Sequence, residues 1–120
     1  MTTRYTETHE WVNLEGDTAT IGITHHAAEE LGDVVFVEAK EAGTELAAGE
    51  AVAVVESVKA ASDIYTPLQA TVLSFNEKLS DDPSLINSAP EGEGWIVKVK
   101  LASPEEFDRL LSAEQYQQKL

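Results

Sequence analysis

The chain has 120 residues, with 22 acidic side chains against 8 basic ones, a formal net charge of −14 and no cysteine. This length predicts a single domain, residues 1–120, that buries a sufficient core without disulfides or a structural metal. The missing cysteines exclude thiolate zinc sites, iron–sulfur clusters and cysteine nucleophiles, and the negative charge disfavours nucleic acid and anionic membranes but favours basic patches on partner proteins.

Residues 1–12 (MTTRYTETHEWV) contain neither the apolar segment of a secretory signal nor the arginine-rich pattern of a transit peptide. No apolar run elsewhere approaches membrane-spanning length. We therefore expect a bacterial cytoplasmic protein, found in the mitochondrial matrix only if a transit peptide has been removed.

Short β-rich runs separated by turn residues follow along the chain, which is typical of an all-β sandwich or barrel. The runs that predict strands are 17–24, 33–39, 50–57, 70–76 and 95–101. Residues 26–31 predict a short helix that ends at Gly32. In the last strand, alternation predicts one buried face and one polar face. The apolar face holds Trp95, Val97, Val99 and Leu101, and the polar face holds Lys98 and Lys100.

The C-terminal residues predict two short helices at the edge of the sheet. Ser103 and Glu106 have the spacing of a capping box, with Pro104 at the first helical position. Ser112 and Gln115 repeat this spacing, so a second helix is expected over residues 113–119.

A lone lysine, Lys59, lies between two β-runs, residues 51–57 and 61–67. This arrangement predicts a hairpin with the turn SVKA, residues 57–60, at its tip. A tip lysine presents a primary amine that an enzyme can acylate to build a swinging arm. The small neighbours Ser57, Ala60, Ala61 and Ser62 leave room for such an enzyme. The alternative is an ordinary solvated turn lysine.

Five segments of the chain resemble the glycine cleavage H-protein family, in the same order and at compatible spacing. These segments are HEWV (9–12), IGITHHAAEELGDVVFVE (21–38), ESVKAASDIYTP (56–67), INSAPEGEGWIVKVK (86–100) and LLSAEQY (110–116). The resemblance implies a mainly β fold, a flattened β-sandwich or barrel-sandwich hybrid like that of lipoyl domains.

The resemblance also implies a function, that of a non-catalytic carrier with lipoate in amide linkage to Lys59. The carrier would take an aminomethyl group from a pyridoxal-phosphate glycine decarboxylase to a tetrahydrofolate-dependent aminomethyltransferase. A flavin-containing dihydrolipoyl dehydrogenase would reoxidise it. The missing cysteines fit this role, because lipoate brings both sulfurs. Lipoylating enzymes are further partners, and we expect a monomer that makes transient contacts.

The same resemblance implies a cleft in which the loaded arm docks. Glu10 and Asp63 are the candidate carboxylates for the cargo amine, and Thr8 could add a hydroxyl or a carbonyl. Glu56, three residues before Lys59, is the candidate for recognition by the lipoylating enzyme. Each of these acids could instead be an ordinary surface residue.

Two positions depart from the family pattern. Ala70 stands where glycine is common, and alanine would cost about 1 kcal/mol or more if that position needed a positive φ. Glu91 stands where tyrosine is common, and we expect only a change at the surface.

Other sites and functions are less favoured. His25 and His26 are adjacent, so in an extended chain they would point to opposite faces and could not share a metal. No set of side chains has the pattern of an independent catalytic site. A biotinyl domain is disfavoured because Val58 and Ala60 replace the methionines that usually flank the modified lysine. A lipoyl relay to other complexes and an unmodified acidic binding module are the alternatives that stay open.

Overall fold

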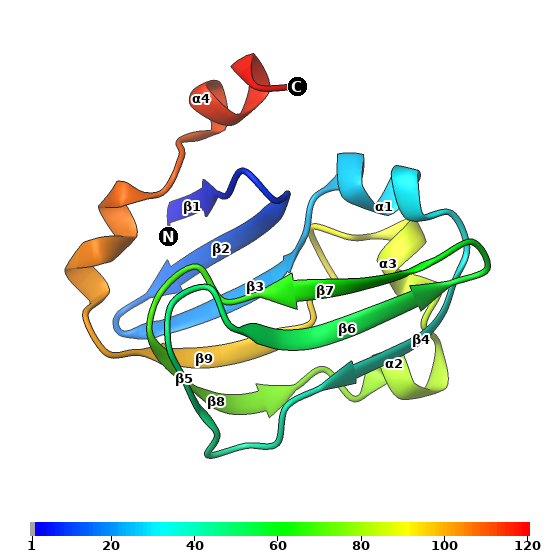
Figure 1. The fold of residues 1–120 in the computed structure, drawn as a ribbon, viewed down its shortest axis with the longest axis horizontal. Helices are drawn as coiled ribbons and strands as arrows, with labels where there is room; N and C mark the ends of the chain where they lie inside the picture. The colour runs from blue at the N-terminus through cyan, green and yellow to red at the C-terminus, as the bar shows by residue number, and fades with distance from the viewer. Residues whose placement is uncertain (1) are drawn as a thin grey trace.

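The computed structural model describes residues 2–120 and contains two antiparallel sheets with short helices at their ends (Figure 1). The strands are β1 (Thr2–Tyr5), β2 (Glu10–Glu15), β3 (Thr18–Ile23), β4 (Val34–Ala39), β5 (Glu45–Leu46), β6 (Ala51–Ser57), β7 (Ala61–Tyr65), β8 (Ala70–Phe75) and β9 (Val97–Leu101). The helices are α1 (His25–Leu31), α2 (Lys78–Asp81), α3 (Leu85–Ser88), the 3-10 helix η1 (Pro104–Arg109) and α4 (Ala113–Gln118).

The larger sheet has six strands in the order β1-β2-β3-β9-β8-β5, and the smaller has three in the order β4-β6-β7. Every neighbouring pair is antiparallel. Buried side chains of both sheets form one apolar cluster. Its members without exposed surface are Val12, Ala19, Ile21, Val52, Val55, Leu79, Ile86, Ile96, Val97 and Val99. The predicted mainly β sandwich is therefore confirmed.

Strand β9 shows the alternation that the sequence predicts over most of its length. Val97, Val99 and Leu101 are buried, whereas Lys98 and Lys100 are exposed. The prediction is wrong at Trp95, because β9 begins two residues later and Ile96 is the buried residue there. Trp95 is half-buried, and the Nζ of Lys98 lies 5.1 Å from the centre of its ring.

Helix α1 confirms the predicted helix, beginning one residue earlier than expected. The Oγ1 of Thr24 accepts the Ala27 N–H at 3.3 Å as an N-cap, and the helix ends at Gly32 with φ of 76°. His25 and His26 are therefore helical, so our assumption of an extended chain there was wrong. Each histidine pairs with a glutamate one turn later, and within residues 2–120 no group of three or more histidine, aspartate or glutamate side chains is placed to hold a metal ion.

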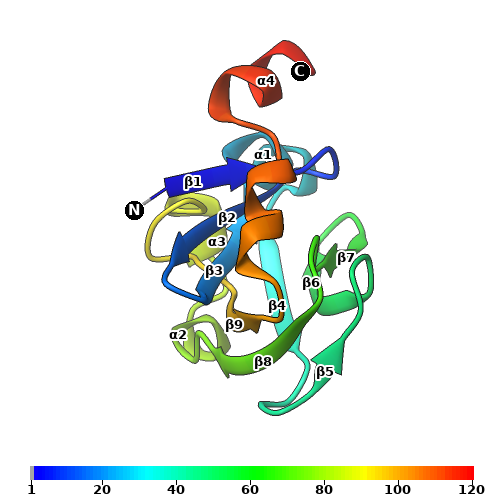
Figure 2. The ribbon, with the colours of Figure 1, turned by 90° about the vertical axis from the view of Figure 1, so that its left-hand side faces the viewer.

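The two C-terminal predictions have opposite outcomes. Ser112 forms its capping box with Gln115 and begins α4, as predicted. Ser103 makes no side-chain cap, since its backbone has φ of −134° and ψ of 83°, and the helix that follows is 3-10 rather than α. Figure 2 shows η1 crossing the ends of the strands and α4 lying beyond β1. Leu111 pairs with Tyr5 through two backbone hydrogen bonds, which places this segment at the edge of the six-stranded sheet.

The two departures from the family pattern are accommodated without strain. Ala70 is the first residue of β8, and within residues 2–120 the positive φ angles of non-glycine residues are confined to His9, at 69°. Ala70 therefore has no positive φ, and alanine costs no backbone strain there. Glu91 is exposed, as expected, but its carboxylate also accepts the backbone N–H of His25 at 2.9 Å.

Candidate functional site

The hairpin of β6 and β7 carries Lys59 at its tip, as the sequence predicts. The N–H of Ser57 donates to the carbonyl oxygen of Ala60 at 2.8 Å, and the Ser57 hydroxyl accepts the N–H groups of Lys59 and Ala60. These bonds fix the backbone of the turn. The Lys59 side chain is exposed, and no ion pair among residues 2–120 includes it. The amine is therefore accessible on an ordered backbone.

A groove of about 310 Å³ runs beside this tip, between β7, α1 and the loop that precedes β2. Polar groups at its walls come from Thr8, His9, Glu30 and Asp63. Its apolar lining comes from Ile23, Ala27, Leu31 and Ile64. Ala60 and Ala61 of the hairpin also line it, so a group attached to the Lys59 amine would find this groove next to its attachment point.

Glu10 is buried and does not line the groove. It is only 2% exposed, and its Oε1 accepts the hydroxyls of Thr6 and Thr8, each at 2.5 Å. Its Oε2 accepts the backbone N–H of Tyr65 at 3.3 Å. The structure thus brings Thr8 and Asp63 to one groove, and it connects Glu10 to that groove through the Thr8 hydroxyl.

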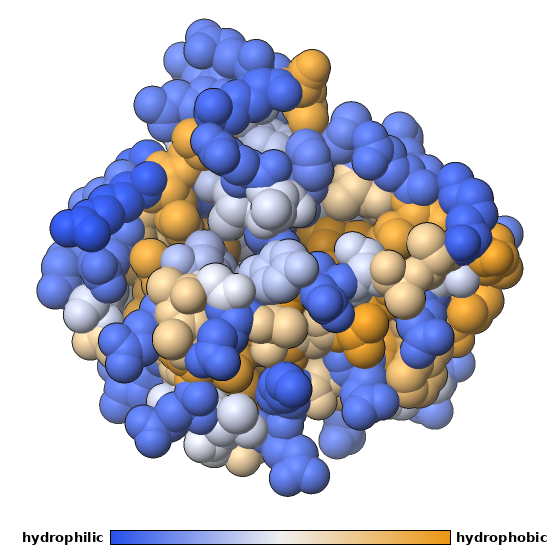
Figure 3. Space-filling model, in the orientation of Figure 1, coloured by the Kyte–Doolittle hydropathy of each residue, from blue (hydrophilic) through white to orange (hydrophobic). Residues whose placement is uncertain are grey.

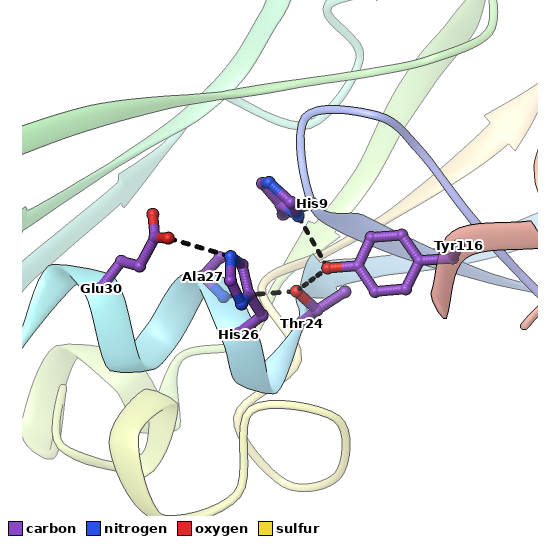
Figure 4. Close-up of polar contacts among 6 residues, drawn as sticks. All are labelled: His9, Thr24, His26, Ala27, Glu30 and Tyr116. Carbon is purple, nitrogen blue, oxygen red and sulfur yellow. Dashed lines mark hydrogen bonds and ion pairs between the residues drawn. The ribbon is translucent and has the colours of Figure 1, made fainter. Parts of the chain in front are cut away.

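Sequence reasoning missed a network that joins the groove to the C-terminal helix (Figure 4). The Nδ1 of His9 and the Oγ1 of Thr24 each lie 2.7 Å from the hydroxyl of Tyr116. The His9 ring also lies 4.7 Å from the ring of His26, whose Nε2 pairs with Glu30 at 2.9 Å. His9 and Tyr116 are 107 positions apart, so no local pattern in the sequence signals their contact.

Tyr116 is 4% exposed, and this burial raises the pKa of its hydroxyl above the ordinary value. The negative charges of Glu91, Glu30 and Glu10 raise the pKa further, against a lowering by the hydrogen bond with Thr24. A neutral Tyr116 can donate to one partner and accept from the other. It therefore holds His9 and Thr24 in one network.

Glu56 lies on β6, three residues before Lys59, with an exposed side chain. In the register of the smaller sheet it stands between Phe36 of β4 and Ala61 of β7. Its carboxylate is thus presented on the strand that leads into the tip.

Exposed apolar side chains lie near Glu56, at the tip and on β4. Val58 is 68% exposed at the tip, and Val35 and Phe36 of β4 are 55% and 45% exposed. Figure 3 shows hydrophobic surface at the end of the molecule where Figure 1 places the hairpin. Such surface is typical of a site for protein contact.

Within residues 2–120, no helix is long and apolar enough to cross a membrane. The arrangement offers an accessible amine, a neighbouring groove with acidic and hydroxyl groups, and an apolar surface around the tip. These groups suit attachment and shelter of a cargo better than a chemical reaction at the protein's own side chains.

Comparisons with known proteins agree with this arrangement. The family model described as "Glycine cleavage H-protein" matches residues 3–120. A glycine cleavage system H protein of Vibrio vulnificus is 59% identical over 116 residues, covering 96% of this chain and 92% of the relative. One from Thermotoga maritima is 51% identical over 115 residues, covering 96% and 93%. The crystal structure of a glycine cleavage system H protein from Mycobacterium marinum superposes with a TM-score of 0.86 at 37% identity, covering 98% of this chain and 97% of that one.

Proposed function

Because the chain belongs to the glycine cleavage H-protein family, whose members are non-catalytic lipoyl carriers of the glycine cleavage system, we propose that Lys59 is the residue that bears lipoate. The observation that supports this choice is the position of Lys59 at the tip of the β6–β7 hairpin. The other lysines lie elsewhere: Lys40 follows β4, Lys78 begins α2, Lys98 and Lys100 lie within β9, and Lys119 follows α4.

The exposed amine and the small, exposed Ala60 beside it fit an amide-linked arm. Bound lipoate would supply a disulfide that can be reduced and can accept a one-carbon amine unit. The partners of the carrier are the glycine decarboxylase, the aminomethyltransferase and the dihydrolipoyl dehydrogenase of the system. This chain contributes the attachment point, the groove and the surface that each partner meets.

The groove beside the tip is proposed to hold the cargo amine. Asp63 lines the groove, and a carboxylate pairs well with a protonated amine. Thr8 supplies a hydroxyl, which Glu10 holds in place from below. Shelter in the groove would keep water away from a cargo that hydrolyses readily.

Glu56 is proposed to help the lipoylating enzyme recognise the hairpin. The support is its exposed position on β6, in a chain whose net charge of −14 would attract a basic surface on the enzyme. Replacing Glu56 by glutamine should slow lipoylation while leaving the fold unchanged, which a time course with the modifying enzyme would measure.

Location and oligomeric state are further proposals. Relatives from Vibrio vulnificus and Thermotoga maritima are bacterial, and they support a bacterial cytoplasmic protein. A monomer suits a carrier that visits several active sites in turn, and light scattering would test it.

The test of the attachment site is lipoylation of the purified protein by a lipoate ligase, followed by intact-protein and peptide mass spectrometry. We expect one lipoyl adduct on the peptide that contains Lys59, and none in the Lys59→Arg variant. Lys40→Arg is the matched control, because it changes another exposed lysine, one that lies beside the start of β6 and away from the tip. An adduct on any other lysine, or a bare Lys59 while a known carrier is modified, would contradict the proposal.

The groove has its own test, release of the amine cargo from loaded protein. Asp63→Asn and Thr8→Ala should each release it faster than wild type, because each removes one group that would hold the amine. Asp17→Asn is the control, since Asp17 is an exposed acid in the turn between β2 and β3. Equal release from all four proteins would show that the groove does not hold the cargo.

A further inference from the structure

The hairpin tip rests on the segment that follows α1. The residue before Lys59 makes this contact: the N–H of Val58 donates to the carbonyl oxygen of Asp33 at 3.0 Å. The Lys59 stem lies over Gly32, so closely that a β-carbon on Gly32 would be 3.1 Å from the Cε of Lys59. Gly32 lies under the Lys59 stem and Asp33 binds the backbone of the tip, so these two residues form the surface on which the tip rests.

Asn87 of α3 holds this surface from its other side. Its Nδ2 donates to the carbonyl oxygen of Gly32 at 2.8 Å, and its Oδ1 accepts the N–H of Val34 at 2.9 Å. One side chain therefore fixes the backbone both before and after Asp33. Asn87 is half-buried and lies outside the groove that could shelter a cargo.

We propose that Asn87 is a positioning residue for the lipoylation of Lys59. This inference rests on the proposed function, because it assumes that Lys59 is the modified residue. By fixing Gly32 and Val34, Asn87 fixes the Asp33 carbonyl that holds the Val58 N–H, and so holds the tip in the orientation in which the enzyme receives the lysine. Without Asn87 the tip samples other orientations, and the enzyme binds only the fraction that is correctly placed.

This role predicts a kinetic effect that a loss of stability does not produce. If the competent tip is populated only in part, the KM of the lipoylating enzyme for this protein rises in inverse proportion, while kcat stays the same. A variant that is merely less stable remains almost fully folded at the assay temperature, so its KM does not change.

The chain offers a matched control in Asn76. Its Nδ2 donates to two backbone carbonyl oxygens, those of Glu93 and Trp95, each at 2.8 Å. Asn76→Ala therefore also removes a side chain that holds a loop backbone by hydrogen bonds, and at a more buried position. These bonds hold the segment that leads into β9, and not the tip.

The experiment is steady-state lipoylation of wild-type protein, Asn87→Ala and Asn76→Ala by a lipoate ligase, with product counted by mass spectrometry. For Asn87→Ala we expect KM to rise roughly fivefold, the effect of losing about one hydrogen bond's stabilisation of the tip, with kcat unchanged. For Asn76→Ala both constants should match wild type. Amide exchange at Val58 should quicken in Asn87→Ala alone, while exchange within β9 stays slow.

A second variant changes the surface under the tip directly, at Gly32. Gly32→Ala should raise KM as Asn87→Ala does, since the new methyl group meets the Lys59 stem. Gly49→Ala is its control, because Gly49 also has a positive φ, 88°, and no atom lies within 4 Å of the added methyl. If Asn87→Ala is modified with wild-type constants, or if Asn76→Ala shows the same rise in KM, Asn87 has no positioning role. If wild-type Lys59 is not modified at all, the proposed function fails first.

Discussion

The Nδ1 of His9 lies 2.7 Å from the hydroxyl of Tyr116, and this contact joins the loop at the groove to the last helix of the chain. His9 has a φ of 69°, a conformation that side chains with a β-carbon rarely adopt. The hydrogen bond to Tyr116 helps to hold it there. Because Thr8 and Glu10 flank His9, the C-terminal helix helps to set the position of the groove wall.

Removing this hydroxyl should destabilise the protein. Tyr116→Phe keeps the stacking on Tyr5, where ring centres are 5.0 Å apart, but leaves His9 and Thr24 without their shared partner. We expect a loss of about 1–2 kcal/mol in the free energy of unfolding, measured with urea. Tyr65→Phe is the control, since Tyr65 is 37% exposed and should change stability by less than about 0.5 kcal/mol. Equal effects of the two changes would contradict a special role for the Tyr116 hydroxyl.

The free energy of unfolding should fall at alkaline pH because of the stacked tyrosines Tyr5 and Tyr116. Burial raises the pKa of both Tyr116 and Tyr5 in the folded protein above the ordinary value of 10.0, and the charge of Glu91 raises the pKa of each further. Below pH 10 both states keep these protons, so the contribution is fully present. As the pH rises above 10 the unfolded chain releases them first, and stability is lost. Urea unfolding between pH 8 and 11 should show this decline, and a shallower one in Tyr116→Phe.

Glu10 should be required for stability as well as for the groove. In Glu10→Gln, one of the two oxygens becomes an NH2 group, so either the two threonine hydroxyls or the Tyr65 N–H loses an acceptor in a buried place. We expect a loss of about 1–3 kcal/mol in the free energy of unfolding. Glu15→Gln, at the exposed end of β2, should cost less than about 0.5 kcal/mol. A Glu10→Gln protein as stable as wild type would show that the hydrogen-bond donors around Glu10 do not need a carboxylate.

Gly22 is needed because Trp11 covers it. A β-carbon at Gly22 would lie 2.7 Å from three atoms of the Trp11 ring, which is itself held by a 2.9 Å hydrogen bond from its Nε1 to the carbonyl oxygen of Pro90. Gly22→Ala should therefore displace the ring and cost about 1–3 kcal/mol. Thermal unfolding and tryptophan fluorescence would report both effects. Gly92→Ala is the control, because its methyl would meet Ala89 at an ordinary 3.9 Å, and an equal loss there would argue against overpacking at Gly22.

The features that could be predicted from the sequence are those that depend on neighbours in the chain. The hairpin at Lys59 follows from two β-runs around a short turn, and the Ser112 cap follows from one spacing of three residues. The spacing at Ser103 looks the same, but the backbone there has φ of −134° and the side chain makes no cap, while Phe107 of the helix that follows is buried in the core. A local signal can therefore be overruled by tertiary structure.

The features that could not be predicted depend on contacts between distant segments. Strands β1 and β2 were missed because their outward side chains are largely polar and their pairing becomes evident only in the sheet. Thr24 before residues 25–31, with Gly32 after them, was a usable signal that α1 begins at His25. No comparable signal exists for His9 with Tyr116, or for Asn87 with Gly32.

The order in which the ribosome makes the chain gives these distant contacts a further meaning. The hairpin, the surface beneath it and Asn87 all lie within residues 32–87, so the proposed attachment point is assembled from segments made before β9. The bonds of Tyr5 with Leu111 and of His9 with Tyr116 form only after residues 111 and 116 have left the exit tunnel. The hairpin that carries Lys59 and the contacts that hold the groove wall are therefore completed at different moments of synthesis.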